Sequence, residues 1–466
     1  MAFLQRTMNR GSVSTGYDVD NSCKFEDANS EGLHKSLSSQ SQDCFTISFW
    51  LKRTALGAQR LVGAGSDGNN EVIIHFTSSD QLEFYAWESA YRMRYKTNRV
   101  FRDTSAWYHF AFLVDTRLST ASERTQLYVN GVLETSFAAE VQPGLNGQFP
   151  WTTNVYVGKA GAAADSDMSG YLSEFVYLDD TKAAHTDLGE FDSDTGIWKP
   201  IDVSGLTFGT NGAYLDFKDS SNLGNDANGG TDFTETNITS ADQSTDTPTN
   251  NFCTWSPLWA ESRANGTITE GATQVAWGGG AWKIARSSMA VSKGRWYWEI
   301  KAANVTGDTW NNNLFGFASV DGEDGQYGPT VLLGYSTGNY YYRVANSQTG
   351  QDNWGNSGGA WSSSDTFGFA LDLESSTKKF ILYRNGSAVN GSGTDLVSAF
   401  QTEQFFTPYS TSYNGDTQFL NWGGYTVNTI STPASDENGY GTFEYAPPSG
   451  YYALCGKNLA EFGGTA

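Results

Sequence analysis

Short runs in which hydrophobic and polar residues alternate fill the first part of the chain. In FTISFWLKR (45–53), the apolar residues from Phe45 to Leu51 occupy every second position, the period with which side chains alternate across a strand. AWYHFAFLVD (106–115) is apolar on both faces, which is typical of a central strand. Further runs of this kind predict an N-terminal arm followed by a β-sandwich within residues 1–190: EVIIHFTSS, QLEFYAWES, TQLYVNGVLETSF, NVYVGKA and GYLSEFVYLDD.

A second set of strand-like runs predicts another sandwich over residues 254–428. GRWYWEIKA (294–302) alternates, and Asn385-Gly386 marks a tight hairpin. Further strands are expected in NLFGFASV, VLLGYSTGNYYYRVAN, DTFGFALDLESSTKKFILYRNGSAV and FFTPYSTSYNGDTQFLNWG. The expected fold class is therefore all-β, with two antiparallel β-sandwiches joined by a long connector.

The stretch between the two predicted sandwiches has a different composition. Residues 191–253 are dense in Asp, Asn, Thr, Ser and Gly, and only AYLDF (213–217) resembles a strand. We predict an extended connector laid over the flank of a neighbouring domain, with a mobile linker as the alternative. Residues 429–466 contain several prolines and glycines and are expected to form an extended C-terminal tail.

Charge and hydropathy exclude two classes of partner. The chain has 29 Lys and Arg against 51 Asp and Glu, a net charge of −22, and such a field repels the phosphates of nucleic acid. No apolar run approaches the roughly 20 residues that a membrane helix needs, so membrane insertion is not expected. The start, MAFLQRTMNRGS, lacks the apolar core of a signal peptide, which predicts folding in the cytoplasm where the chain is made.

The cysteines do not form a metal-binding pattern. Cys23 and Cys44 could pair, as could Cys253 and Cys455, but buried free thiols are favoured for a chain made in a reducing cytoplasm. Calcium is a separate question, because loop carboxylates suit this hard cation. The local candidates are Asp165, Asp167, Asp179 and Asp180. Clustered Asp is expected in so acidic a chain, so solvated carboxylates are favoured over a calcium site.

Catalytic chemistry is not expected. A glycosidase needs two carboxylates about 5–5.5 Å apart, or somewhat more in inverting enzymes, and Glu174 and Glu299 each lack an acidic residue two positions away on their strands. We interpret both as solvated acids. His109 is interpreted as a structural histidine within its strand. No catalytic residues are assigned and no cofactor is expected, with calcium left open.

Sugar sites combine aromatic faces with amide and carboxyl hydrogen bonds. The segments NSQTGQDNWGNSGGAWSS (346–363) and GDTWNNN (307–313) are rich in both, and we read them as loops. The expected recognition residues are Trp310, Asn353, Trp354, Asn356 and Trp361. Buried tryptophans that anchor their loops are the alternative.

The first region resembles a laminin-G/concanavalin A-like jelly roll. The order FTISFWLKR, WYHFAFLVD, LYVNGVLE, VYVGKA and GYLSEFVYLDD carries the resemblance over about 180 residues. The opening YDVDNSCKFEDANSEGLHKSL and the segments GEFDSDTGIWKP and DFTETNITSADQSTDTPTNNF are similar to parts of bacteriophage structural proteins.

The second region resembles a SPRY domain over about 160 residues, through GRWYWEIK, LFGFAS, DTFGFALDLESSTKKFILYRNG and FFTPYSTSYNGDTQFLNWG. It departs from the pattern at Lys378, Lys379 and Arg384. The resemblance implies a recognition module that binds through loops.

Together the resemblances imply a structural protein of a bacteriophage virion, a tail or capsid appendage that presents a carbohydrate- or receptor-binding surface for host attachment. Other virion proteins and a host cell-surface glycan or receptor are the expected partners, the virion is the expected location, and a homo-oligomer is compatible with such a setting. Two alternatives stay open: a polysaccharide-degrading enzyme of concanavalin A-like fold, and a secreted adhesion module. The sequence does not separate tail from capsid.

Overall fold

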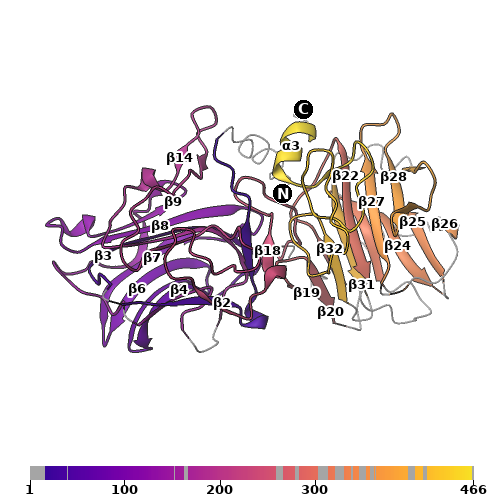
Figure 1. Ribbon diagram of the computed structural model, residues 1–466. Helices are drawn as coiled ribbons and strands as arrows, with labels where there is room; N and C mark the ends of the chain where they lie inside the picture. Colours follow the sequence, from indigo (N-terminus) through magenta and orange to yellow (C-terminus); the bar gives the residue numbers. More distant parts are fainter. Residues whose placement is uncertain are drawn as a thin grey trace. The chain divides into compact units, whose positions relative to one another are not determined.

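The chain folds into two compact units, one ending at Thr249 and the other beginning at Asn250 (Figure 1). Strands account for 45% of the residues that the structure describes and helices for 5%, so the all-β class is confirmed. The computed structural model describes residues 16–38, 40–151, 153–161, 166–258, 266–278, 283–302, 313–320, 330–336, 339–345, 353–356, 362, 364–396, 405–412 and 417–463.

The first unit contains two large antiparallel sheets, which we call the covered sheet and the open sheet. The covered sheet has the order β10 (Val132–Leu133), β9 (Thr125–Val129), β8 (Trp107–Asp115), β3 (Cys44–Arg53), β13 (Gly170–Asp179), β1 (Ser22–Phe25), β18 (Gln243–Ser244), with β16 (Ala213–Leu215) also on β13. The open sheet has the order β11 (Phe137–Val141), β7 (Tyr91–Val100), β6 (Gln81–Glu88), β5 (Asn70–Phe76), β4 (Gln59–Asp67), β12 (Asn154–Val157), β2 (Gly32–Ser36), β17 (Thr234–Thr236).

The alternation along the strands builds the core between these sheets. Phe45, Phe49 and Leu51 of β3 pack there with side chains of the open sheet such as Ile74 and Phe84. Strand β8 lies between β9 and β3, which confirms its predicted central position. The other face of β3 is buried as well, although its sequence is polar, so something must cover it.

This outer face is covered by residues 191–249, which we expected to be part of a connector between the sandwiches. We call these residues the covering segment. Residues 191–249 belong to the first unit, and strands β16, β17 and β18 extend its two sheets. The hairpin β14 (Glu190–Phe191) and β15 (Trp198–Lys199) and the short 3-10 helices η3 (His185–Asp187) and η4 (Ser240–Asp242) lie in the same part of the chain. Apolar side chains from this part pack on the outside of β8 and β13 and include Ala183, Leu188, Val203, Phe208 and Tyr214.

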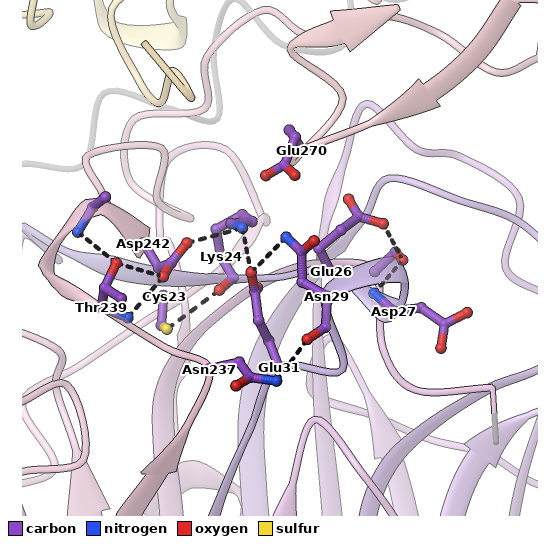
Figure 2. A network of polar contacts seen from close by, with 12 residues as sticks. Cys23, Lys24, Glu26, Asp27, Asn29, Glu31, Asn237, Thr239, Asp242 and Glu270 are labelled. Carbon is purple, nitrogen blue, oxygen red and sulfur yellow. Dashed lines mark hydrogen bonds and ion pairs between the residues drawn. The ribbon is translucent and has the colours of Figure 1, made fainter. Parts of the chain in front are cut away.

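Buried ion pairs fasten the covering segment to the sandwich. The ammonium of Lys24 lies 2.8 Å from both Glu31 and Asp242, and Figure 2 shows these two carboxylates on different sides of the Lys24 side chain. Two more lysines pair with acids of the same segment, Lys35 with Asp226 at 3.1 Å and Lys52 with Asp246 at 2.6 Å. All three ammonium groups are buried. Some of the acidic residues of the predicted connector therefore form one side of a buried interface with the sandwich.

The second unit is also a pair of antiparallel sheets. One has the order β19 (Gly266–Thr269), β20 (Gln274–Trp277), β32 (Thr417–Asn421), β22 (Arg295–Ala302), β27 (Thr366–Asp372), β28 (Lys379–Arg384), β29 (Ser387–Ala388), with β30 (Thr394–Asp395) on β28. The other has the order β21 (Lys283–Arg286), β31 (Phe406–Ser412), β23 (Asn313–Ser319), β24 (Thr330–Ser336), β25 (Asn339–Ala345), β26 (Asn353–Asn356). The remaining short 3-10 helices, η1 (Asp27–Asn29) and η2 (Ala121–Glu123), belong to the first unit.

Residues 429–466, which we expected to form an extended C-terminal tail, contain regular secondary structure. Strand β33 (Tyr452–Ala453) pairs in parallel with β22, and the helix α3 (Gly456–Phe462) follows it. Phe443, Leu454 and Leu459 are buried. The tail therefore completes the second unit, because its apolar side chains close the outside of β22 and one end of the core.

The four cysteines are buried and free. Burial raises the pKa of the Cys455 thiol to about 12, which disfavours the reactive thiolate. In the part of the chain that the structure describes, no helix is long and apolar enough to cross a membrane.

Candidate functional site

The predicted recognition residues of the second unit fall at the margin of the described structure. Trp310 and Trp361 lie outside the described residues. Asn353, Trp354 and Asn356 lie on β26, the edge strand next to β25, with Trp354 opposite Tyr342. We had read this stretch as a loop, whereas part of it pairs as a strand. The role of these residues in recognition stays a prediction.

The calcium candidates do not converge. Asp165 lies outside the described residues, and Asp167 and Asp179 lie at opposite ends of β13 (Gly170–Asp179), which are roughly 30 Å apart at strand spacing. Asp179 accepts hydrogen bonds from Ser41 and Asn211. Asp180 pairs with Arg117 at 2.8 Å. Over the described ranges, no group of three or more His, Cys, Asp or Glu could hold a metal ion.

The outer face of the covered sheet is buried under other parts of the chain, whereas part of the outer face of the open sheet is accessible to solvent. Every residue of β3 and β13 in the covered sheet is buried. Strand β7, and β6 from Phe84 on, instead alternate between buried and partly exposed residues, whereas residues 72–74 of β5 are all buried. Buried positions such as Phe84 face the core, so Tyr85 and Trp87 face outward. A surface of aromatic and charged side chains therefore stays partly accessible.

We call this surface the aromatic face. Trp87 and Tyr85 each meet Tyr91 edge-on, with ring centroids 4.8 and 5.8 Å apart, and the guanidinium of Arg94 lies 4.4 Å from the Tyr91 ring centroid. These contacts hold the rings in fixed orientations. The aromatic face comprises Glu71, His75, Glu83, Tyr85, Trp87, Tyr91 and Arg94.

Charged groups on the aromatic face orient one another. Tyr85 donates a hydrogen bond of 2.6 Å to Glu71, and burial together with this bond raises the pKa of the Tyr85 hydroxyl. Glu83 accepts from Arg94 at 2.6 Å and lies 3.3 Å from His75. Burial tends to raise the pKa of Glu83, but hydrogen bonds from His75 and Arg94 outweigh it and the pKa is lowered. The lowered pKa favours the ionised form of Glu83, which lies beside the aromatic rings of this face.

A second aromatic pair lies on the same sheet. Tyr156 of β12 stacks on His34 of β2, with ring centroids 5.7 Å apart and an interplanar angle of 27°. Asn154 donates a hydrogen bond of 3.3 Å to the Tyr156 hydroxyl. Both rings are partly exposed, so this pair, which we call the Tyr156–His34 platform, also faces solvent.

The aromatic face is suited to binding and lacks the geometry of a glycosidase. Glu71 and Glu83 lie on adjacent strands, and Glu71 is four positions along β5 from His75, the partner of Glu83. That offset is about 13 Å along the strand, beyond the separation of a retaining or inverting acid pair. Aromatic rings with fixed polar groups instead resemble a recognition surface.

Two acids that we interpreted as solvated are buried. Glu174 accepts a 2.8 Å hydrogen bond from Tyr214, and Glu299 accepts bonds of 2.9 Å from the backbone amides of Glu444 and Tyr445. Burial raises the pKa of each carboxyl to about 7. That interpretation was wrong, because segments distant in sequence fold over both side chains. Their donors belong to the covering segment and to the tail, which indicates a structural role.

His109 is a structural histidine, as we expected. It is buried beside Trp50, with ring centroids 4.8 Å apart, and its Nε2 lies 2.8 Å from the Ser48 hydroxyl. Burial lowers its pKa to about 3, so the imidazole is neutral at physiological pH.

Sequence reasoning missed the aromatic face although it located the strand. QLEFYAWES (81–89) was assigned as a strand, and its alternation already separates Glu83, Tyr85 and Trp87 from Leu82 and Phe84. The available signal was a strand with aromatic residues on its more polar side.

Comparisons with known proteins bear on the fold. The family model Laminin_G_3, described as the concanavalin A-like lectin/glucanases superfamily, matches residues 26–184. This confirms the laminin-G/concanavalin A-like resemblance of the first sandwich. A search of curated proteins finds no match.

Solved structures with similar folds include three of interest. The SPRY domain of human HERC1 is 17% identical, with a TM-score of 0.25 over 33% of this chain and 91% of that chain. Mouse laminin α1 domains LG4-5 are 10% identical, with a TM-score of 0.29 over 94% of this chain and 97% of that chain. A candidate carbohydrate-binding protein from Bacteroides ovatus is 18% identical, with a TM-score of 0.32 over 48% of this chain. This chain covers only 60% of that protein's length.

Proposed function

We propose that this protein is a non-enzymatic carbohydrate-binding protein and that the aromatic face of its first sandwich holds the glycan. The observation that carries the proposal is the unequal cover of the sandwich. The covering segment buries one outer face, while Tyr85, Trp87 and Tyr91 stay partly exposed on the other. Exposed aromatic rings grouped on a sheet are typical of interaction surfaces.

The chemistry of the aromatic face suits a sugar. Aromatic rings cover the apolar face of a pyranose, and neighbouring carboxylate and guanidinium groups hydrogen-bond its hydroxyls. Glu71 and Arg94 lie beside the rings and are themselves oriented by Tyr85 and Glu83. Groups held in this way lose little conformational freedom on binding, which favours affinity.

The experiment is a glycan array probed with the labelled full chain, followed by titration of the glycans bound by the parent. We expect Trp87→Ala combined with Tyr91→Ala to weaken binding at least tenfold without changing the circular dichroism spectrum. Tyr128→Ala is the matched control, because Tyr128 is a partly buried tyrosine on the covered sheet that stacks on His185 at 4.5 Å. Undiminished binding by the double variant would contradict this assignment of the site.

The second unit offers a competing site. Trp354→Ala with Trp361→Ala tests the residues that we expected from the sequence, and loss of binding in this variant alone would move the site to the second unit. Loss in both variants would indicate that each unit contributes to binding.

The setting that we propose for this binding is a bacteriophage virion, as an appendage of the tail or capsid that attaches to a host glycan. The ground for this setting is the resemblance that we noted in the sequence of YDVDNSCKFEDANSEGLHKSL, GEFDSDTGIWKP and DFTETNITSADQSTDTPTNNF to phage structural proteins. Other virion proteins would be partners, and a homo-oligomer would match the symmetry of the attachment point. Mass spectrometry of purified particles tests the location, and absence from particles would contradict it.

A polysaccharide-degrading enzyme is the competing function. Release of reducing ends from a bound polysaccharide by the full chain would establish it, and the separation of Glu71 and Glu83 leads us to expect none. A secreted adhesion module would instead bind glycan and be found outside the cell that makes it.

A further inference from the structure

We propose that the aromatic face recognises a glycan with one isolated anionic group, a carboxylate or a sulfate on an otherwise neutral sugar chain, and that Lys96 of β7 binds this group. The inference rests on the proposed function and adds to it the charge of the ligand and the residue that selects it. It is carried by the position of Lys96 beside the rings, by the residues that surround Lys96, and by the charge of the whole chain.

The accessible part of the aromatic face is centred on β6 and β7. Ile73 of β5 is 1% exposed, and a Cβ on Gly63 of β4 would lie 2.5 Å from the Cα of Ala160. The middle of β5 and the neighbouring part of β4 are therefore closed to a ligand. Tyr85 of β6 and Lys96 of β7 are both partly exposed, so a glycan on this face lies over these two strands and does not cross β4.

Lys96 differs from the other basic residues of β7 in its lack of an acidic partner. The three arginines of this strand each form an ion pair with a glutamate at 2.6–3.5 Å, namely Arg92 with Glu88, Arg94 with Glu83 and Arg99 with Glu134. Among the residues that the structure describes, no hydrogen bond or ion pair reaches the ammonium of Lys96. The chain has 51 acidic residues against 29 basic ones, and a lysine that pairs with none of these acids is available to an external anion.

The strand register explains why Lys96 has no partner. It lies opposite Glu83 of β6 on one side and opposite Ala139 of β11 on the other. Opposite charges in such paired positions usually attract each other, but the two carboxylate oxygens of Glu83 are engaged by Arg94 and His75. Ala139 is small and carries no charge. Neither cross-strand neighbour therefore compensates the charge of Lys96.

The side chain of Lys96 lies within reach of a sugar on the rings. Tyr85 is opposite Arg94, which is two positions from Lys96 along β7, so all three side chains are on the same side of the sheet. Tyr85 and Lys96 are thus diagonal neighbours, roughly 7–8 Å apart and within reach of a long side chain. An anionic substituent on a pyranose that covers Tyr85 can therefore pair with the ammonium.

The charge of the chain favours a ligand with few anionic groups. The net charge of −22 repels polyanions, whereas the attraction of one ammonium is strong only within the screening length of about 8 Å. Lys96 therefore compensates one anionic group in contact with it, and each further group of a polyanion meets an acidic protein. A single charge on the sugar chain satisfies the site without this repulsion.

The experiment titrates the full chain with glycans that differ by one anionic group. The defined sets are lactose with its sialylated and sulfated forms, and xylotetraose with and without one glucuronic acid branch. Each acidic glycan bound in the array screen is also compared with its carboxyl-reduced counterpart. We expect the anionic member of at least one set to bind about fivefold more tightly than its neutral counterpart, the size expected of one partly exposed ion pair. The lactose set distinguishes a carboxylate from a sulfate.

Substitutions of Lys96 test its role in this preference. Lys96→Gln should abolish the preference and leave the affinity for the neutral member unchanged, because only the charge is lost. Lys96→Arg retains the charge and should retain most of the preference. Lys218→Gln is the matched control. It removes the same charge from an exposed lysine of the covering segment, which pairs with Asp216 at 3.8 Å, and it should leave both affinities unchanged.

The outcomes separate the two proposals. Binding that depends on Trp87 and Tyr91 but is equal for neutral and anionic members overturns this inference and leaves the proposed function intact. A preference that survives Lys96→Gln overturns the role of Lys96, and tighter binding of polygalacturonate than of every singly charged glycan overturns the choice of an isolated charge. Failure to bind any glycan overturns both proposals. Circular dichroism and melting of each variant exclude misfolding.

Discussion

The buried pair of Lys52 and Asp246 provides the sharpest test of how the covering segment is held. The ammonium lies 2.6 Å from the carboxylate, with side-chain exposures of 0% and 1%. The other carboxylate oxygen of Asp246 accepts a 2.9 Å hydrogen bond from the indole of Trp107. We expect Asp246→Asn to loosen the covering segment, because it removes the charge that compensates Lys52 and preserves the shape of the side chain.

The size of the effect follows from the burial. Removing one partner of a buried ion pair leaves an uncompensated charge away from water and costs about 3–5 kcal/mol. Replacing both partners by apolar residues is often close to neutral. Lys52→Met combined with Asp246→Leu removes both charges but also the acceptor of the Trp107 indole, so it should restore only part of the stability that Asp246→Asn removes. Glu88→Gln, which disrupts the exposed pair of Glu88 with Arg92, should change stability by less than about 1 kcal/mol.

Hydrogen exchange with mass spectrometry on the full chain resolves this prediction by segment, which a single melting temperature of a two-unit chain does not. In Asp246→Asn, peptides from residues 213–249 and from β3 should exchange faster, while peptides of the second unit stay unchanged. The explanation is refuted if these first-unit peptides keep the parent rates, or if the double apolar variant is as unstable as the single one.

Two further predictions follow from the first unit. Glu31 is buried at 2% exposure, and burial raises its pKa from 4.5 to about 7, so the folded state holds a proton that the unfolded state releases between these pH values. Stability of the first unit should therefore fall by roughly 2–3 kcal/mol as pH rises from about 4.5 to 7. Glu31→Gln should flatten that slope in urea unfolding at a series of pH values, and an unchanged slope would exclude Glu31 as its source. Gly63→Ala should destabilise the first unit by about 1–3 kcal/mol, because the added methyl group would overpack against Ala160. The measurement is the thermal midpoint of the first unit, which should fall. A midpoint equal to that of the parent would show that the chain at Ala160 moves aside without cost.

The two sandwiches could be predicted from the sequence because strand burial has a period of two. FTISFWLKR and GRWYWEIKA each place alternate side chains in a core, and that pattern needs no knowledge of the partner strand. Strand order within the sheets is different, since β3 pairs with β13 across more than a hundred residues. The resemblance to known families predicted the kind of sandwich, and the strand order came from the structure.

We predicted that residues 191–253 lie over the flank of a neighbouring domain, but composition did not reveal that residues 191–249 add strands to the first unit and bury their acids there. Asp226 and Asp246 resemble solvated acids in a loop, but their lysine partners lie 191 and 194 residues away in sequence. A charged side chain is buried only when an oppositely charged group pairs with it in the folded chain. The local sequence does not reveal a partner that lies so far away along the chain. The aromatic face was hidden for a related reason, because the outward side of β6 becomes a candidate surface only once the other sheet is known to be covered.

In the first unit, the ion pair that we expect to stabilise the fold and the residues that we assign to glycan binding lie on different sheets. Tyr85 and Trp87 project from β6, whose inward residues Leu82 and Phe84 are fixed in the core, so the aromatic face is held by the sandwich itself. The Lys52–Asp246 pair lies on the opposite sheet. Variants of that pair should therefore lower stability while folded molecules retain parent affinity for glycan. Variants of Trp87 and Tyr91 should do the reverse, because partly exposed rings contribute less to the core than to a ligand that covers them.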